Sequence, residues 1–183
     1  LILVFVLATF VACSGVQNKE IFTSNANTKN ADLVLIATSD FHASIDKAEA
    51  FGATIRKVRA IYNDRVLHLD GGDLFQGSLE GNLSKGRAVV DLYNILGVDA
   101  AAIGNHELDY GPVVEGRIQV RPGEDGLGNL KARAQDAKFA WLSANIVQKN
   151  SERCQPGLRC NALGEKTVFA PRRIFNKNGT KTC

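Results

Sequence analysis

The chain has 183 residues, of which 45% are hydrophobic and 22% are charged, and its formal net charge is +3. This length and composition suit one globular domain with a sizeable core. The small charge excess, without a basic run or interleaved aromatic residues, gives no reason to expect a nucleic-acid partner.

The N-terminal segment is almost wholly apolar up to Ala12. A run of about 12 apolar residues is too short to span a bilayer but fits the core of a secretory signal peptide. Cys13 follows in a context that resembles a bacterial lipobox, although Phe10 departs from the usual Leu; a secretory signal with an incidental Cys is the alternative. We predict a signal peptide with lipobox over 1–13 and a flexible tether over 14–30. The protein is then exported to the periplasm or cell surface, and reaches the membrane through a lipid anchor if Cys13 is acylated.

Export makes disulfide bonds possible. Cys154 and Cys160 bracket a five-residue loop. A disulfide is favoured over a metal site there, because the sequence shows no nearby His and no further close-set Cys. Cys183 is the last residue and has no evident partner.

The predicted elements then alternate between strands and helices. An apolar run over 33–37 suits a strand buried on both faces. A helix capped near Ser44 or Asp46 follows, with apolar residues at spacings of three and four up to Tyr62. The next elements are a strand over 66–69, a helix over 86–96 with Gly97 as its C-cap, and a strand over 100–103. This order predicts an α/β fold with a parallel sheet.

The chain changes character after Tyr110. Residues 111–129 are rich in Gly and charge and are expected to form a long loop that shapes substrate access. A short helix over 130–137 and a strand over 141–144 follow. Residues 168–175 and the Asn178-Gly179 turn indicate a hairpin. We expect residues 31–183 to be the N-terminal part of a longer domain.

Polar motifs follow the first three strands: Asp40 and His42, then Gly71-Gly72-Asp73, then Gly104-Asn105-His106-Glu107. Asp73 lies 33 residues after Asp40, and Asn105 lies 32 residues after Asp73. Each interval is about one βαβ unit, so the motifs are expected at the carboxyl ends of neighbouring parallel strands. That edge would hold oxygen and nitrogen ligands for a pair of divalent metals.

Each motif predicts a separate contribution. Asp40 and His42 would point the same way in an extended backbone and reach one ion. Asp73 could bridge two cations, and Asn105 offers a neutral carbonyl oxygen. His106 would point elsewhere.

Asp109 could accept a hydrogen bond from the His106 ring and support an imidazolium. Glu107 is expected to hold the loop. His68 lies inside the second strand and is interpreted as a structural residue.

Taken together, these motifs resemble those of the calcineurin-like metallophosphoesterases. The residues of these motifs, and Leu142-Ser143-Ala144-Asn145 further on, are similar to those of the bacterial 5′-nucleotidase and 2′,3′-cyclic-nucleotide phosphodiesterase branch. The resemblance implies an αββα sandwich, of which only the N-terminal βαβαβ part is present. It also implies a nucleotide substrate, hydrolysed by a hydroxide that two divalent metal ions activate.

The resemblance assigns residue roles as well. Asp40 and His42 would bind the first ion, Asp73 both ions, and Asn105 the second, with His106 and Asp109 as the catalytic pair. Mn, Fe, Zn or Co would suit these ligands equally.

The family's downstream Gly-His-x-His motif does not occur in these 183 residues. The chain alone is therefore expected to be inactive. The alternatives are a related thiosulfohydrolase or a non-catalytic lipoprotein that binds a nucleotide or a metal. The oligomeric state is left open.

Overall fold

The computed structural model describes residues 31–147 and 167–183, and the backbone of residues 3–8. The predicted tether, the lipidation candidate Cys13 and the disulfide candidates Cys154 and Cys160 lie outside these residues. Among the described residues, Cys183 is an exposed free thiol. No helix in the described ranges has the length and apolar character needed to cross a membrane.

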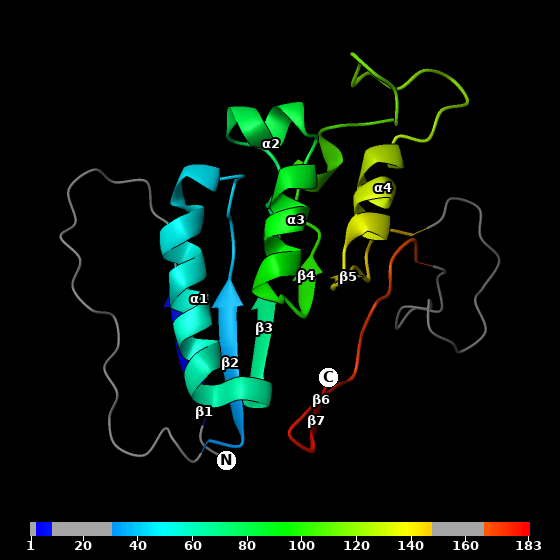
Figure 1. Cartoon of the computed structure of the whole chain (residues 1–183). Helices are drawn as coiled ribbons and strands as arrows, with labels where there is room; N and C mark the ends of the chain where they lie inside the picture. The colour runs from blue at the N-terminus through cyan, green and yellow to red at the C-terminus, as the bar shows by residue number, and fades with distance from the viewer. Residues whose placement is uncertain (1–2, 9–30, 148–166) are drawn as a thin grey trace.

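A five-stranded sheet forms the centre of the structure (Figure 1). Its strands are β1 (Leu3–Ala8), β2 (Leu33–Thr38), β3 (Val66–Asp70), β4 (Ala100–Ala102) and β5 (Ala140–Leu142). They lie in that order, and every neighbouring pair is parallel. The prediction of a parallel βαβαβ arrangement is therefore confirmed.

The N-terminal segment adds a strand that was not expected. β1 pairs with β2 in the register Leu3 to Leu33 and extends the sheet at one edge. The assignment of 1–13 as a signal peptide concerns processing after synthesis and stays a prediction.

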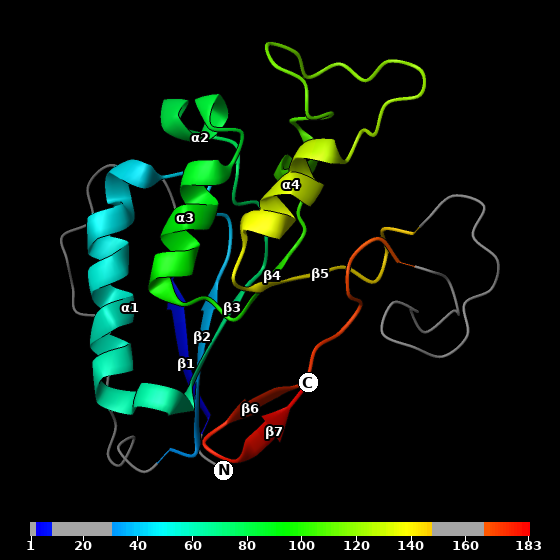
Figure 2. The same cartoon turned by 45° about the vertical axis from the view of Figure 1, so that its right-hand side comes forward.

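Three helices, α1 (Ala48–Tyr62), α3 (Arg87–Leu96) and α4 (Gly128–Asp136), lie on the same face of the sheet in both views (Figures 1 and 2). A fourth helix, α2 (Leu79–Leu83), is short and was not predicted. α1 ends at Asn63 with φ of 50° and α3 ends at Gly97 with φ of 67°, both in the left-handed region. These are the helix ends that the sequence indicates.

The core lies between the helices and the sheet. Phe51 of α1 and Tyr93 of α3 are buried, and both rings contact Phe41, which follows β2. Phe139 and Trp141 continue this aromatic cluster toward β5. Because Phe41 lies in the loop after β2, these ring contacts attach that loop to the core.

The opposite face of the sheet presents Leu35, Leu69, Ala102 and Leu142, all of which are half-buried. No helix of the described residues covers this face. Of the four layers expected for an αββα sandwich, the described part of the chain supplies one helix layer and one sheet.

The hairpin near the C-terminus is shorter than expected. Its strands are β6 (Phe175–Lys177) and β7 (Thr180–Thr182), which join through Asn178 and Gly179 at φ of 48° and 79°. Two positive φ values suit the tight turn of a two-residue hairpin. Residues 168–174 are not a hairpin strand; Ala170 instead pairs with Leu142 beside β5.

Candidate metal centre

The motif loops meet at the carboxyl ends of β2, β3 and β4. The backbone N–H of Asp40 donates to the carbonyl of Gly72 at 2.9 Å, and that of His42 donates to the carbonyl of Asp73 at 3.0 Å. The pairing of β2 with β3 thus continues past the strand ends. The first two motifs therefore lie side by side, as their position in the βαβ units predicts.

The backbone of these loops is not extended. Asp40, His42 and Asp73 have φ values of 56°, 48° and 59°. The extended geometry expected for the segment from Asp40 to His42 is therefore wrong. The cross-loop hydrogen bonds hold these residues in the left-handed region, which side-chain-bearing residues rarely occupy.

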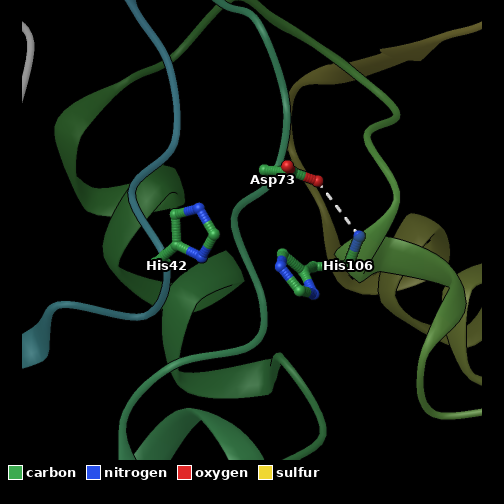
Figure 3. A group of neighbouring side chains, drawn as sticks. All are labelled: His42, Asp73 and His106. Carbon is green, nitrogen blue, oxygen red and sulfur yellow. Dashed lines mark hydrogen bonds between the residues drawn. The ribbon is translucent and has the colours of Figure 1, made fainter.

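Three side chains form a cluster that could bind a metal: His42, Asp73 and His106 (Figure 3). One ligand atom from each lies within 4.8 Å of the other two, and all three residues are half-buried. The two imidazole rings meet edge to face with centroids 4.9 Å apart. Two ring nitrogens and a carboxylate oxygen are the donors that Zn, Fe, Mn and Co accept, so these residues fit a divalent metal.

His42 is oriented by its backbone surroundings. Its Nδ1 lies 3.2 Å from the carbonyl oxygen of Gln76, which can only accept a hydrogen bond. Nδ1 therefore carries the proton of the neutral ring, and Nε2 keeps its lone pair. A hydrogen bond on one ring nitrogen is the usual way in which a metal-binding His is held.

The remaining predicted ligands lie at the rim. The Oδ1 atom of Asp40 is 3.7 Å from Nε2 of His42, and the Asp40 side chain is 62% exposed. Asn105 is exposed and begins the 3₁₀ turn His106–Leu108. Of the four predicted ligands, the structure thus brings His42 and Asp73 together, places Asp40 beside His42, and adds His106 to the cluster.

The hydrogen bond expected between His106 and Asp109 is present, with Nδ1 and Oδ2 2.7 Å apart. This bond raises the pKa of His106 above its ordinary value, and the negative charges of Asp109, Asp73 and Glu107 act in the same direction. The arrangement therefore favours the imidazolium form of His106. In that form both ring nitrogens carry protons, so His106 lies beside a metal held by the other residues and is not itself a ligand.

Glu107 joins the second and third motif loops. Its Oε2 accepts from the backbone N–H of Asp73 at 3.0 Å and of Gly104 at 2.7 Å, and its Oε1 accepts from Leu74 at 2.6 Å. The side chain is buried. Burial raises the pKa of Glu107, while these three hydrogen bonds lower it. The contacts agree with the expectation that Glu107 holds the loop.

Close packing at Gly104 fixes the same two loops. A Cβ atom on Gly104 would collide with Oδ1 of Asp73. That oxygen also accepts a hydrogen bond from the backbone N–H of His106 at 3.0 Å (Figure 3). The lack of a side chain at Gly104 therefore allows the third loop to approach the carboxylate of Asp73.

His68 lies in β3 and is fully buried. Its Nε2 is 3.0 Å from Oγ1 of Thr38, and burial, more than any other effect, lowers its pKa to about 4. A neutral ring in the core agrees with the structural role expected for His68.

No model of a protein family matches the chain. Individual proteins do match it. A snake venom 5′-nucleotidase from Gloydius brevicauda is 33% identical over 135 residues, which cover 66% of this chain and 21% of that protein. The trifunctional nucleotide phosphoesterase protein YfkN of Bacillus subtilis is 41% identical over 83 residues, covering 45% of this chain and 6% of YfkN. Protein UshA of Yersinia enterocolitica is 29% identical over 163 residues, covering 84% of this chain and 24% of UshA.

Solved structures show the same relationship. The 5′-nucleotidase precursor from Thermus thermophilus is 27% identical with a TM-score of 0.54, covering 80% of this chain and 26% of that one. The calcineurin-like phosphoesterase YfkN from Bacillus subtilis shares the fold, with a TM-score of 0.52 at 20% identity, over 81% of this chain and 44% of that one. The chain spans about a quarter or less of the length of the curated relatives it matches.

Proposed function

We propose that this chain, which is similar to 5′-nucleotidases and to a nucleotide phosphoesterase, forms part of a metal-dependent nucleotide phosphoesterase of the calcineurin-like family. The substrates are nucleotide phosphomonoesters or cyclic nucleotides. The observation that carries the proposal is the cluster of His42, Asp73 and His106, on three loops at one edge of a parallel sheet.

Two divalent ions would be held at this edge. His42 and Asp73 face one another and supply ligands, and Asp40 and Asn105 complete the set from the rim. Ions in such a site polarise the phosphoryl oxygens and lower the pKa of a bound water to near neutrality. Mn, Fe, Zn and Co all accept this combination of carboxylate, imidazole and amide donors.

His106 and Asp109 are the proposed catalytic pair. Asp109 holds Nδ1 of His106, which fixes the ring and keeps a proton on it. The imidazolium offers positive charge to the phosphate as negative charge develops there, and its other ring nitrogen donates a proton to the departing alkoxide. The raised pKa of His106 supports this role, because the ring must be protonated at the start of the reaction.

The test is a substrate panel with the protein encoded by the complete gene, loaded with manganese. We expect phosphate release from AMP or a 2′,3′-cyclic nucleotide, and none of it without metal. His106→Asn should remove turnover and retain most of the bound metal, while Asp64→Asn, a change at an exposed residue, should leave both unchanged. Release of sulfate from a thiosulfonate conjugate alone, or binding of a nucleotide without turnover, would contradict the proposed reaction.

We further propose that the protein is exported. The apolar segment before Cys13 and the venom location named for its snake relatives support export. Lipid attachment at Cys13 stays a prediction. If it occurs, labelled palmitate should be incorporated into the protein and Cys13→Ala should abolish that incorporation.

A further inference from the structure

A second buried carboxylate lies beneath the metal centre, at Asp70 in the last position of β3. Its Oδ1 accepts a hydrogen bond from the backbone N–H of Gly72 at 2.8 Å. Its Oδ2 accepts from the hydroxyl of Thr38 at 2.5 Å and from that of Tyr93 at 3.1 Å. All three partners act as donors, so the carboxylate acts only as an acceptor.

These bonds connect three elements of the core. Thr38 is the last residue of β2 and lies directly opposite Asp70 in the sheet, and Tyr93 reaches over from α3. Because the Thr38 hydroxyl uses its one proton on Asp70, it accepts from Nε2 of His68. Asp70 is therefore held from two sides by groups that are themselves buried.

The carboxylate in turn shapes the loop that carries Asp73. Gly72 has φ of 97°, and a Cβ atom there would lie 2.7 Å from the backbone nitrogen of Gly104. An Asp side chain that binds the N–H two residues further on stabilises a tight turn. The carbonyl of Gly72 also accepts from the N–H of Asp40. The position of Gly72 thus determines where both metal-binding loops lie.

We propose that Asp70 is a positioning residue of the metal centre, which sets the place of the Asp73 carboxylate by holding the Gly72 amide. This inference rests on the proposed function, because it concerns the same metals. Asp70 itself does not face the cluster. It acts through one backbone N–H, that of Gly72, while its bonds to Thr38 and Tyr93 contribute to the stability of the core.

Substitutions can separate this role from a general contribution to stability. Asp70→Leu keeps the branched shape and removes every acceptor, so the Gly72 amide loses its partner. Asp70→Asn retains one oxygen, which can still accept from Gly72, while the amide group donates to the two hydroxyls. Tyr93→Phe removes a buried hydrogen bond to the same carboxylate and leaves Gly72 untouched.

The experiment measures cobalt affinity by calorimetry, the cobalt absorption spectrum, and hydrogen exchange at Gly72 in the purified chain. All variants are compared at a temperature at which each is folded. We expect Asp70→Leu to lower cobalt affinity about tenfold or more, as loss of groups that support metal ligands does. Its spectrum should change and its Gly72 amide should exchange faster. Asp70→Asn and Tyr93→Phe should remain close to the parent in all three measurements.

If Asp70→Leu does not fold, the variant that combines it with Thr38→Val and Tyr93→Phe takes its place. This combination removes the two hydroxyls that would lose their acceptor, at the expense of the bond that Nε2 of His68 makes to Thr38. A parent-like cobalt affinity and spectrum in the folded Asp70→Leu or combined variant would overturn the role of Asp70 and leave the metal site standing. A loss of cobalt affinity in Tyr93→Phe equal to that in Asp70→Leu would do the same. A parent chain that binds no cobalt would overturn the metal site, and the inference with it.

Discussion

Replacement of Glu107 by Gln should cost a large share of the stability of the folded chain. The two side chains have the same shape, but Gln has a single acceptor oxygen. If that oxygen takes the place of Oε2, it keeps the bonds from Asp73 and Gly104. The amide nitrogen then faces the backbone N–H of Leu74, which now donates to Oε1 at 2.6 Å. A donor would meet a donor in a buried position.

The magnitude follows from these contacts. One hydrogen bond to a charged acceptor is lost, and such bonds contribute about 1.5–3 kcal/mol. The buried N–H of Leu74 is left without a partner, while the two retained bonds weaken because the acceptor is neutral. Against this, the variant no longer buries a charge, a cost that the raised pKa of Glu107 reflects. We expect a net loss of about 2–3 kcal/mol.

Urea unfolding followed by circular dichroism measures this loss as a lower midpoint at an unchanged slope. Glu115→Gln is the matched control, because Glu115 is exposed in the loop after Gly111. Its stability should lie within about 0.5 kcal/mol of the parent. If Glu107→Gln unfolded at the same urea concentration as Glu115→Gln, Glu107 would not join the two loops in the way described.

Three further changes test other parts of the structure. The pKa of His68 is about 4 in the folded chain, against 6.5 in the unfolded chain. The folded state should therefore lose about 3 kcal/mol of stability as the pH falls from 6.5 to 4, because only the unfolded chain takes up this proton. Urea unfolding of His68→Gln across that range should lack this loss, and an equal pH slope in both proteins would contradict it. Asp109→Asn should lower the pKa of His106 toward its ordinary value, since their hydrogen bond is the main cause of the shift; NMR titration of the metal-free chain measures this, and an unchanged pKa would remove Asp109 as the cause. Gly104→Ala should destabilise the fold by more than about 2 kcal/mol in urea unfolding, because its new Cβ meets backbone and side-chain atoms of the second motif within 2.7 Å. Gly126→Ala is the control, since its nearest contact is 3.3 Å. Equal stability of the two variants would show that the loops can separate freely.

The sequence predicted the elements that carry a strong periodic signal. The apolar run of β2 and the apolar spacing of α1 and α3 indicated these elements within a few residues, and the end of α3 at Gly97 followed from its glycine. The near-equal motif spacing predicted that the three loops would meet at one sheet edge. Each of these features depends on residues near in sequence, whose pattern the chain displays directly.

The details that were missed depend on contacts between distant segments. Asp40 and His42 were expected in an extended backbone, but hydrogen bonds to the second motif loop turn them into the left-handed region. The side-chain partners of Asp70 lie 32 residues before it and 23 residues after it, and no local pattern links them. The segment of β1 was interpreted only as part of a signal peptide, because an apolar run suits a signal peptide and a buried strand equally.

The charged side chains around the cluster together favour a cation, because negative charges outnumber positive ones at this edge. Asp40, Asp73 and Asp109 face this edge with the single imidazolium of His106 among them, although the chain as a whole carries +3. The effect reaches the buried layer: burial is the main cause that raises the pKa of Asp70 and of Glu107, and the charges of Asp40 and Asp73 add to these two shifts. The charged forms of the two buried carboxylates that hold the loops are thus disfavoured in part by Asp40 and Asp73 of the same loops. A divalent cation at the edge would relieve this repulsion in both layers, so metal binding and loop order should be coupled.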